Sequence, residues 1–287
     1  MKLLRYGPKG DEKPGLLDPE GMVRDLSEVI EDLTSAHLGK ATLARLAALD
    51  WRTLPVAPPA RIAPIVADTG KLICVGLNYS DHAAESGMAV PNEPVLFMKA
   101  SSAIIGCNDP VVLPRDSVKS DWEVELGVVI GARARYVEEH EALDYVAGYC
   151  VVNDLSEREY QLERGGTWDK GKGCDTFGPV GPWLVTTDDV PDPQDLDMWL
   201  EVNGKRYQQG STRTMVFNVA QLVSYISRFM TLNPGDIIST GTPPGVGLGQ
   251  RPDPVYLRAG DTMRLGIAGL GEQRQTVHAW DPELIDG

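Results

Sequence analysis

The sequence predicts an α+β protein that is mostly β. From Lys71 onward the chain consists of short apolar runs separated by Gly, Pro and Asp, which is the pattern of β-strands joined by turns. In this region only one segment, Asn218 to Met230, carries its apolar residues along one helical face. Strands and helices alternate too rarely for a barrel of eight parallel strands, so that architecture is not expected.

The composition is that of an ordinary globular protein. We expect this protein to be located in the cytoplasm. Of the 287 residues, 42% are hydrophobic and 24% charged, and a chain of this length can bury a sizeable core. The formal net charge of −14 argues against nucleic acid as a partner, because that binding relies on Lys and Arg. No apolar run suits a signal peptide or a membrane span. The four cysteines lack paired spacing and are expected to be reduced.

The N-terminal part of the chain differs from the rest in its pattern of apolar and turn residues. We predict a small N-terminal α/β domain over residues 1–65 and a metal-dependent catalytic domain over residues 66–287. The Pro-rich segment from Leu54 to Ala60 breaks regular structure and is expected to link the two.

Within the N-terminal part, the sequence predicts two strands and a helix. Lys2 to Tyr6 forms one predicted strand, and turn residues between Pro14 and Gly21 surround another. Leu26 to Leu49 has apolar residues at helical spacing, although Gly39 could divide the helix.

The rest of the chain is predicted to contain strands, hairpins and the single helix. Asn203-Gly204 follows an apolar strand and is a strong hairpin signal, because both residues accept a positive φ. Gly266 to Val277 is predicted to form a closing hairpin. The predicted strands are Lys71–Leu77, Val95–Lys99, Trp122–Gly131, Val146–Asp154, Trp199–Val202 and Asp236–Thr240.

Three acidic residues are the candidate metal ligands. Glu123 and Glu125 alternate with apolar residues, so a strand would point both carboxylates to one face. Asp154 ends another long apolar strand. Carboxylates that converge repel one another unless a cation neutralises them, and oxygen ligands suit Mg²⁺, Mn²⁺ or Ca²⁺. The alternative for the Glu pair alone is a half-exposed strand with solvated acids.

His82 and Glu85 form a second constellation. If the segment after Tyr79 is helical, the two side chains lie three residues apart on one face. A carboxylate beside an imidazole raises its basicity, which suits activation of a water molecule. The alternative is an incidental pair on a surface helix.

Two Gly-rich segments complete the candidate site. Lys172 lies between glycines in the segment from Gly165 to Phe177, where it could meet developing negative charge, or the segment could be a solvated loop. Ser239 to Gly247 leads from a strand end into a Gly/Pro loop whose amides and hydroxyls could hold a carboxylate, or which could be a structural turn.

Together and in this order, these segments resemble the fumarylacetoacetate hydrolase superfamily over roughly Leu72 to Val277. The resemblance implies a rolled β-sandwich with flanking helices, a small variable N-terminal domain and a homodimer. The segments that carry it are Gly76–Glu85, Phe97-Met98-Lys99, Trp122–Gly127, Asn153-Asp154, Trp168–Phe177, Asn203-Gly204 and Thr240–Gly247.

The resemblance also implies a role for each candidate residue. Glu123, Glu125 and Asp154 are similar to the family's ligands for Mg²⁺ or Mn²⁺, with Ca²⁺ able to substitute in crystals. His82 and Glu85 resemble its water-activating dyad, and Lys172 its charge-stabilising lysine. The implied substrate contacts are Tyr79, Lys99 and Thr242.

Two further segments, Gln208–Met215 and Gly266–Gln275, resemble a subgroup that acts on sugar acids and is often labelled ureidoglycolate lyase. The implied reaction is hydrolysis of a carbon–carbon bond in a small 2,4-dioxo acid, such as 2,4-dioxo-3-deoxy-L-fuconate or L-rhamnonate, releasing pyruvate and a hydroxy acid such as lactate. Oxaloacetate decarboxylation, ureidoglycolate lyase activity and a non-catalytic metal-binding scaffold remain the alternatives.

Overall fold

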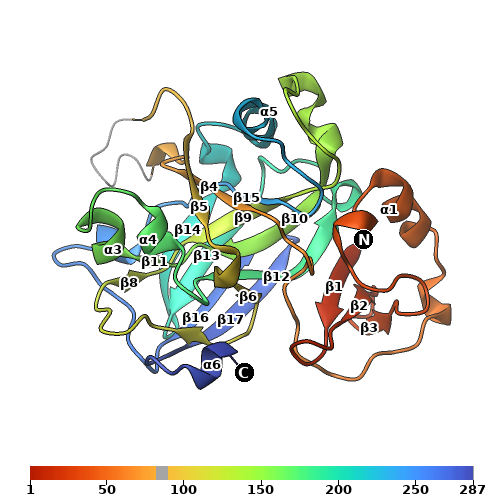
Figure 1. The fold of residues 1–287 in the computed structure, drawn as a ribbon, viewed down its shortest axis with the longest axis horizontal. Helices are drawn as coiled ribbons and strands as arrows, with labels where there is room; N and C mark the ends of the chain where they lie inside the picture. Colours follow the sequence, from red (N-terminus) through yellow and green to blue (C-terminus); the bar gives the residue numbers. More distant parts are fainter. Residues whose placement is uncertain (82–89, 287) are drawn as a thin grey trace.

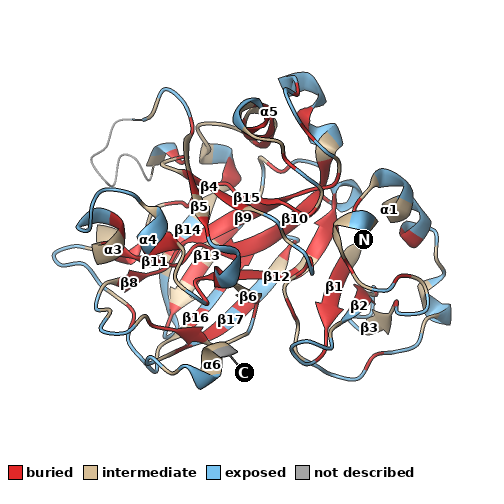
Figure 2. Cartoon of the chain, viewed as in Figure 1, coloured by how far each residue is buried: buried red, intermediate tan, exposed pale blue. Residues whose placement is uncertain are grey.

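The computed structural model describes residues 1–81 and 90–286. Figure 1 shows a β-rich body with the N-terminal residues forming a lobe at its side. The central strands are buried over most of their length, whereas α1 (Lys40–Ala47) and many loops are exposed (Figure 2). No helix in the described part of the chain is long and apolar enough to cross a membrane.

A ten-stranded sheet forms the centre of the molecule. Its strands follow the order β3-β2-β1-β12-β10-β9-β15-β4-β5, and β6 pairs with β12. The β15–β4 and β12–β6 pairs are parallel, and the other pairs are antiparallel. The strands are β1 (Lys2–Tyr6), β2 (Lys13–Leu17), β3 (Val23–Asp25), β4 (Leu72–Gly76), β5 (Val95–Lys99), β6 (Ile104–Gly106), β9 (Val124–Ile130), β10 (Val146–Asn153), β12 (Gly178–Thr186) and β15 (Ile237–Ser239).

A five-stranded sheet of order β14-β13-β16-β17-β7 packs against this first sheet. One hydrophobic cluster joins the two, because Val128 and Val151 of the large sheet share it with Met198 and Leu265 of the small one. The mostly β fold expected from the sequence is thereby confirmed. The strands are β7 (Val111–Val112), β13 (Asp197–Val202), β14 (Lys205–Ser211), β16 (Thr262–Ile267) and β17 (Gly271–His278); β8 (Ser120–Asp121) and β11 (Ser156–Glu157) form a separate small pair.

Both predicted hairpins are present in the small sheet. Asn203 and Gly204, with φ values of 52° and 78°, connect β13 to its antiparallel partner β14. This left-handed backbone is the conformation that favours Asn and Gly at the turn. β16 and β17 pair antiparallel as the closing hairpin.

The predicted helix near the end of the body is also confirmed as α5 (Val219–Phe229). It begins with a capping box, in which the Asn218 side chain accepts from Gln221 N and the Gln221 side chain accepts from Asn218 N. These bonds satisfy amides that have no partner within the helix.

The helix predicted over Leu26 to Leu49 is wrong in its first half. Only α1, which follows Gly39, is α-helical, and the residues before it form turns and a short 3₁₀ segment. Asp32 instead accepts two hydrogen bonds from Arg5, at 2.8 and 2.9 Å. A tertiary ion pair therefore replaces the helix that the apolar spacing favoured.

The N-terminal lobe shares the sheet and a core with the body. β1 pairs with β12, and Leu3 and Leu16 belong to the same hydrophobic cluster as Leu72 and Val129. The division at residues 65 and 66 stays a prediction, since sheet and core continue across it.

Several elements were not predicted. β12 contains Pro179 and Pro182, which sequence patterns treat as strand breakers. The register between β10 and β12 shifts between Tyr149 and Val151, where extra residues of β12 around Pro182 bulge out of the pairing. The short helices α3 (Arg158–Leu162), α4 (Asp169–Lys172) and α6 (Glu283–Asp286) were also missed.

Candidate active site

The three candidate metal ligands meet at the ends of two neighbouring strands. Glu125 lies in β9 and Glu123 just before it, while Asp154 directly follows β10. The antiparallel register pairs Glu125 with Val152, and Asp154 N donates to Glu123 O at 2.9 Å. One carboxylate oxygen from each of Glu123, Glu125 and Asp154 lies within 4.8 Å of the others, and all three residues are buried. Strand register therefore brings together acids that are far apart in the sequence.

Buried cations surround this acidic cluster. Lys172 Nζ donates to Glu123 Oε2 at 2.5 Å and to Asp154 Oδ2 at 2.7 Å. Lys99 Nζ donates to Asp154 Oδ1 at 2.7 Å and to Leu155 O at 2.9 Å. The two lysines thus hold Asp154 in place through both of its oxygens.

The two glutamates differ in their electrostatic environment. Burial alone would raise the pKa of Glu123, but the nearby charges of Lys172 and Arg158 lower it to about 2. Burial, together with the charges of Asp154 and Glu123, holds the pKa of Glu125 well above its usual range. Of the two glutamates, Glu125 is therefore the one whose charge is stabilised more by an additional cation.

Glu125 is also oriented by the neighbouring strand. Its Oε2 accepts from Ser239 Oγ at 2.6 Å and from Gly241 N at 2.9 Å. Among the described residues, Glu125 Oε1 has no hydrogen-bond partner, so this oxygen is available to a ligand. Hard carboxylate oxygens at such spacing fit a divalent cation such as Mg²⁺ or Mn²⁺.

Lys172 lies on α4 and not in a loop as the Gly-rich sequence suggested. Its side chain is buried, and although burial would lower its pKa, the charges of Asp154 and Glu123 keep that pKa above its usual range. A Cβ on the neighbouring Gly171 would lie 2.4 Å from Glu157 O and 2.6 Å from Gln161 Cβ. This glycine therefore serves close packing of α4 against α3, which positions Lys172.

A cavity of about 400 Å³ opens beside the acidic cluster. Glu123, Glu125 and Lys172 line it, and Thr242 lies in its wall. The hydroxyl of Thr242 donates to Val124 O at 2.9 Å and accepts from Gln208 Nε2 at 2.8 Å. Thr242 is thus at the predicted place, but its hydroxyl would have to rotate before it could donate to a substrate carboxylate.

The other two predicted substrate contacts do not line the cavity. Tyr79 is fully buried in the core, and its hydroxyl faces Met198 Sδ at 3.3 Å. Lys99 is turned toward Asp154, so it orients a candidate ligand and does not face the cavity. The substrate-contact role expected for both residues stays a prediction, and in this structure core packing and an ion pair occupy their polar groups. His82 and Glu85 lie outside the described residues.

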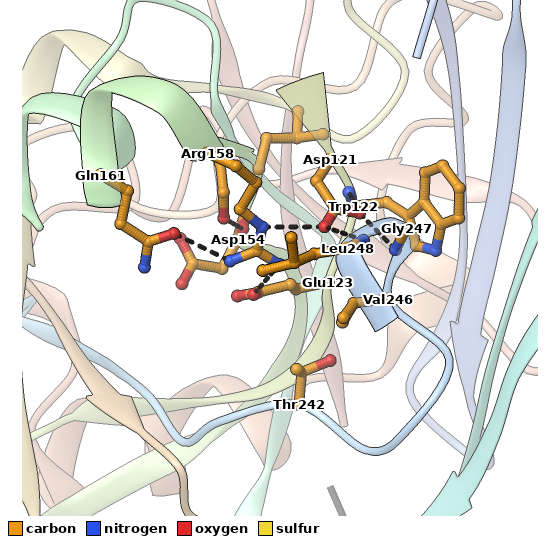
Figure 3. Close-up of polar contacts among 12 residues, drawn as sticks. Asp121, Trp122, Glu123, Asp154, Arg158, Gln161, Thr242, Val246, Gly247 and Leu248 are labelled. Atoms are coloured by element: carbon orange, nitrogen blue, oxygen red, sulfur yellow. Dashed lines mark hydrogen bonds and ion pairs between the residues drawn. The ribbon is translucent and has the colours of Figure 1, made fainter. Parts of the chain in front are cut away.

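Sequence reasoning missed an arginine at the centre of the site. Arg158, the first residue of α3, donates to Glu123 Oε1 at 2.7 Å, to Asp121 Oδ2 at 2.8 Å and to Gln161 Oε1 at 2.9 Å (Figure 3). Arg158 and Gln161 both line the cavity. Their three-residue spacing soon after Asp154 was the available signal, but α3 is too short to show helical periodicity.

The fold and the site together define a β-rich protein with a buried carboxylate centre suited to a divalent metal. Residues 71–278 match the family described as fumarylacetoacetate (FAA) hydrolase C-terminal. The chain belongs to this family.

Known relatives cover nearly the whole chain. A Burkholderia cenocepacia protein with the provisional name of a hydrolase is 66% identical over 96% of this chain and 98% of its own length. The fumarylacetoacetate hydrolase of Exiguobacterium antarcticum is a similar solved structure. Its TM-score is 0.86, and it is 35% identical over 98% of this chain and 100% of its own.

Two further solved structures differ in their named reaction. Maleylpyruvate hydrolase from Sphingobium sp. SYK-6, solved with manganese(II) and pyruvate, has a TM-score of 0.81 and 31% identity over 98% of this chain and 100% of its own. The 2-hydroxyhepta-2,4-diene-1,7-dioate isomerase of Mycobacterium marinum has a TM-score of 0.73 and 33% identity over 97% and 98% of the two chains. Similarity therefore supports a divalent metal more firmly than one reaction.

Proposed function

We propose that the protein uses Mg²⁺ or Mn²⁺ to hydrolyse a carbon–carbon bond in a 2,4-dioxo acid of the acylpyruvate type. The observation that carries this proposal is the meeting of Glu123, Glu125 and Asp154 beside the buried amine of Lys172. A hard cation site next to an ammonium suits a substrate with an oxo group beside a carboxylate. Pyruvate, which is bound in the similar maleylpyruvate hydrolase, contains this arrangement.

In this proposal the side chains hold the substrate and manage the charge that develops. Glu123, Glu125 and Asp154 would hold the metal, which would supply Lewis acidity at the 2-oxo-carboxylate end. His82 and Glu85 take a proton from water as it adds to the C4 carbonyl carbon. The C3–C4 bond then breaks, and its electron pair stays on the pyruvate half as an enolate. Lys172 stabilises this negative charge before C3 takes up a proton.

The residues that line the cavity indicate which chemical group the substrate carries beyond its pyruvate unit. A sugar acid such as 2,4-dioxo-3-deoxy-L-fuconate or L-rhamnonate brings hydroxyl groups that need hydrogen-bond partners. About half of the described wall residues have apolar side chains, which offer few such partners. We therefore propose an apolar or unsaturated acyl group in place of the sugar chain. The apolar side chains of the wall are Val75, Leu77, Phe97, Leu162, Trp168, Val246, Leu248 and Pro254.

A pyruvate-release assay tests the proposal. Acylpyruvates with apolar acyl groups should release pyruvate faster than the dioxo sugar acids, only with Mg²⁺ or Mn²⁺ present and not after chelation. Glu125→Gln, which removes a proposed ligand charge at constant size, should abolish the release. Failure of every 2,4-dioxo acid to yield pyruvate with metal present would reject the proposal.

The same assay separates the alternative activities. Release of CO₂ from oxaloacetate in preference to any dioxo acid would indicate a decarboxylase. Release of glyoxylate from ureidoglycolate would indicate a lyase. Metal binding without any turnover would indicate a non-catalytic scaffold.

A further inference from the structure

Asp121, at the end of β8, is a fully buried carboxylate that the proposed chemistry does not use. Its Oδ1 accepts from Trp122 N at 2.7 Å and from Gly247 N at 2.6 Å. Its Oδ2 accepts from Leu248 N at 2.9 Å and from Arg158 Nε at 2.8 Å. Both oxygens are therefore fully committed, and no acceptor capacity is left for a ligand.

Through these bonds, Asp121 connects the cavity wall to the acidic cluster. Val246 and Leu248, on either side of its partner Gly247, line the cavity. Arg158 lies between Asp121 and Glu123 and donates to both (Figure 3). A single residue, Arg158, thus connects Asp121 to the proposed metal ligand Glu123. In the sequence, Asp121 lies two positions before Glu123.

The arrangement has an electrostatic consequence. Arg158 places a full positive charge against Glu123, where it competes with any cation that this carboxylate should bind. Asp121 brings a negative charge to the same guanidinium, at its Nε. A buried charge that loses its partner is costly, so the three groups act as one unit.

We propose that Asp121 is a positioning residue that offsets the charge of Arg158 and thereby keeps Glu123 able to hold a divalent metal. This inference rests on the proposed metal-dependent function. The alternative is that Asp121 only anchors the loop at Gly247. It would then make the same hydrogen bonds, but its replacement would lower the stability of the protein without changing metal affinity through Arg158.

The test is the affinity of the metal-free protein for Mn²⁺, measured by titration calorimetry. Asp121→Asn keeps the size but removes the charge and should weaken Mn²⁺ binding by at least about tenfold, as is typical for partners that orient metal ligands. The double variant Asp121→Asn/Arg158→Met removes both charges, and its affinity should return toward that of the wild-type protein. This recovery is the signature that a purely structural role would not produce.

Asp18 offers a matched control outside the site. It is a buried carboxylate in the N-terminal lobe that accepts from Glu20 N and Met22 N, each at 2.9 Å, and from Arg24 Nε at 2.7 Å. Asp18→Asn and Asp121→Asn should both lower the melting temperature, but Asp18→Asn should leave Mn²⁺ affinity unchanged.

The outcomes separate this inference from the proposed function. Wild-type affinity in Asp121→Asn, or equal weakening in the single and double variants, would overturn the role of Asp121. If Asp121→Asn does not fold, the double variant alone decides, since weak Mn²⁺ binding there contradicts the charge argument and near-normal binding supports it. Absence of Mn²⁺ binding by the wild-type protein would instead reject the proposed function.

Discussion

At the scale of single residues, Lys172 is the clearest case of a side chain whose chemistry depends on its surroundings. Its amine is buried and donates to both Glu123 and Asp154. A surface lysine would contribute little, whereas a positioned ammonium can stabilise an enolate as it forms.

Replacing Lys172 by Met should therefore affect turnover more than binding. We expect kcat to fall by about 10²–10³, the loss typical for removal of a positioned donor. Metal affinity should stay the same or increase, because the two carboxylates lose a competing cation. Steady-state kinetics and metal titration of the folded variant check this. A near-normal kcat would remove Lys172 from the mechanism.

Glu125 predicts a pH dependence of metal binding. Its pKa lies well above the usual value of 4.5 because of burial and the charges of Asp154 and Glu123. Below this raised pKa, the carboxyl group holds a proton that a metal must displace. Metal affinity should thus increase as pH rises toward the raised pKa and level off above it. Titration calorimetry in buffers of different ionisation enthalpy would detect the released proton, and binding without proton release would contradict the assignment.

At the scale of elements, the packing of α4 on α3 determines where Lys172 lies. Gly171 allows this contact, since any Cβ there would meet Glu157 O at 2.4 Å. The close approach involves backbone atoms, so a side-chain rotation cannot relieve it.

Gly171→Ala should displace α4 and lower kcat, although Lys172 itself is retained. Lys170→Ala, a change on the exposed face of the same helix, should leave kcat near the wild-type value. Kinetics and melting temperatures of the two variants make the comparison. Equal activity of Gly171→Ala and the wild-type protein would show that α4 tolerates the shift.

At the scale of the whole molecule, the N-terminal lobe completes the central sheet. β1 covers one edge of β12, and Leu3 and Leu4 are completely buried. Without residues 1–65, β12 would expose unpaired backbone groups and the shared core would open to water.

We therefore expect the fragment 66–287 to aggregate or fail to fold on its own, and co-expression with residues 1–65 to restore some soluble protein. Circular dichroism and size-exclusion chromatography measure both. A stable, active fragment would show that the predicted domain boundary also separates two independent folding units.

The resemblance to the family also predicts a homodimer. Tyr136 and Phe229 are large side chains that are 67% and 63% exposed, and such surfaces often lie at interfaces. Light scattering should give about twice the chain mass of 31.2 kDa. A mass equal to one chain at micromolar concentration would reject the dimer.

The sequence by itself determined the fold class, most strands of the body and the acidic cluster. Alternation around Glu123 and Glu125 and the apolar strand before Asp154 are local patterns with a direct structural meaning, because side chains alternate along a strand. Asn203-Gly204 and the Asn218 cap are likewise short-range signals, satisfied within a few residues. Such features survive in any tertiary context that forms the same elements.

Only the tertiary structure decided what surrounds the acids. Arg158, Asp121 and Lys99 acquire their roles from contacts between segments that are distant in sequence, and the local sequence around each does not reveal its partners. Tyr79 was expected at the substrate and lies in the core for the same reason. Strand order and helix packing set which charges meet in a buried site, and there the strength of each interaction depends on every neighbouring charge.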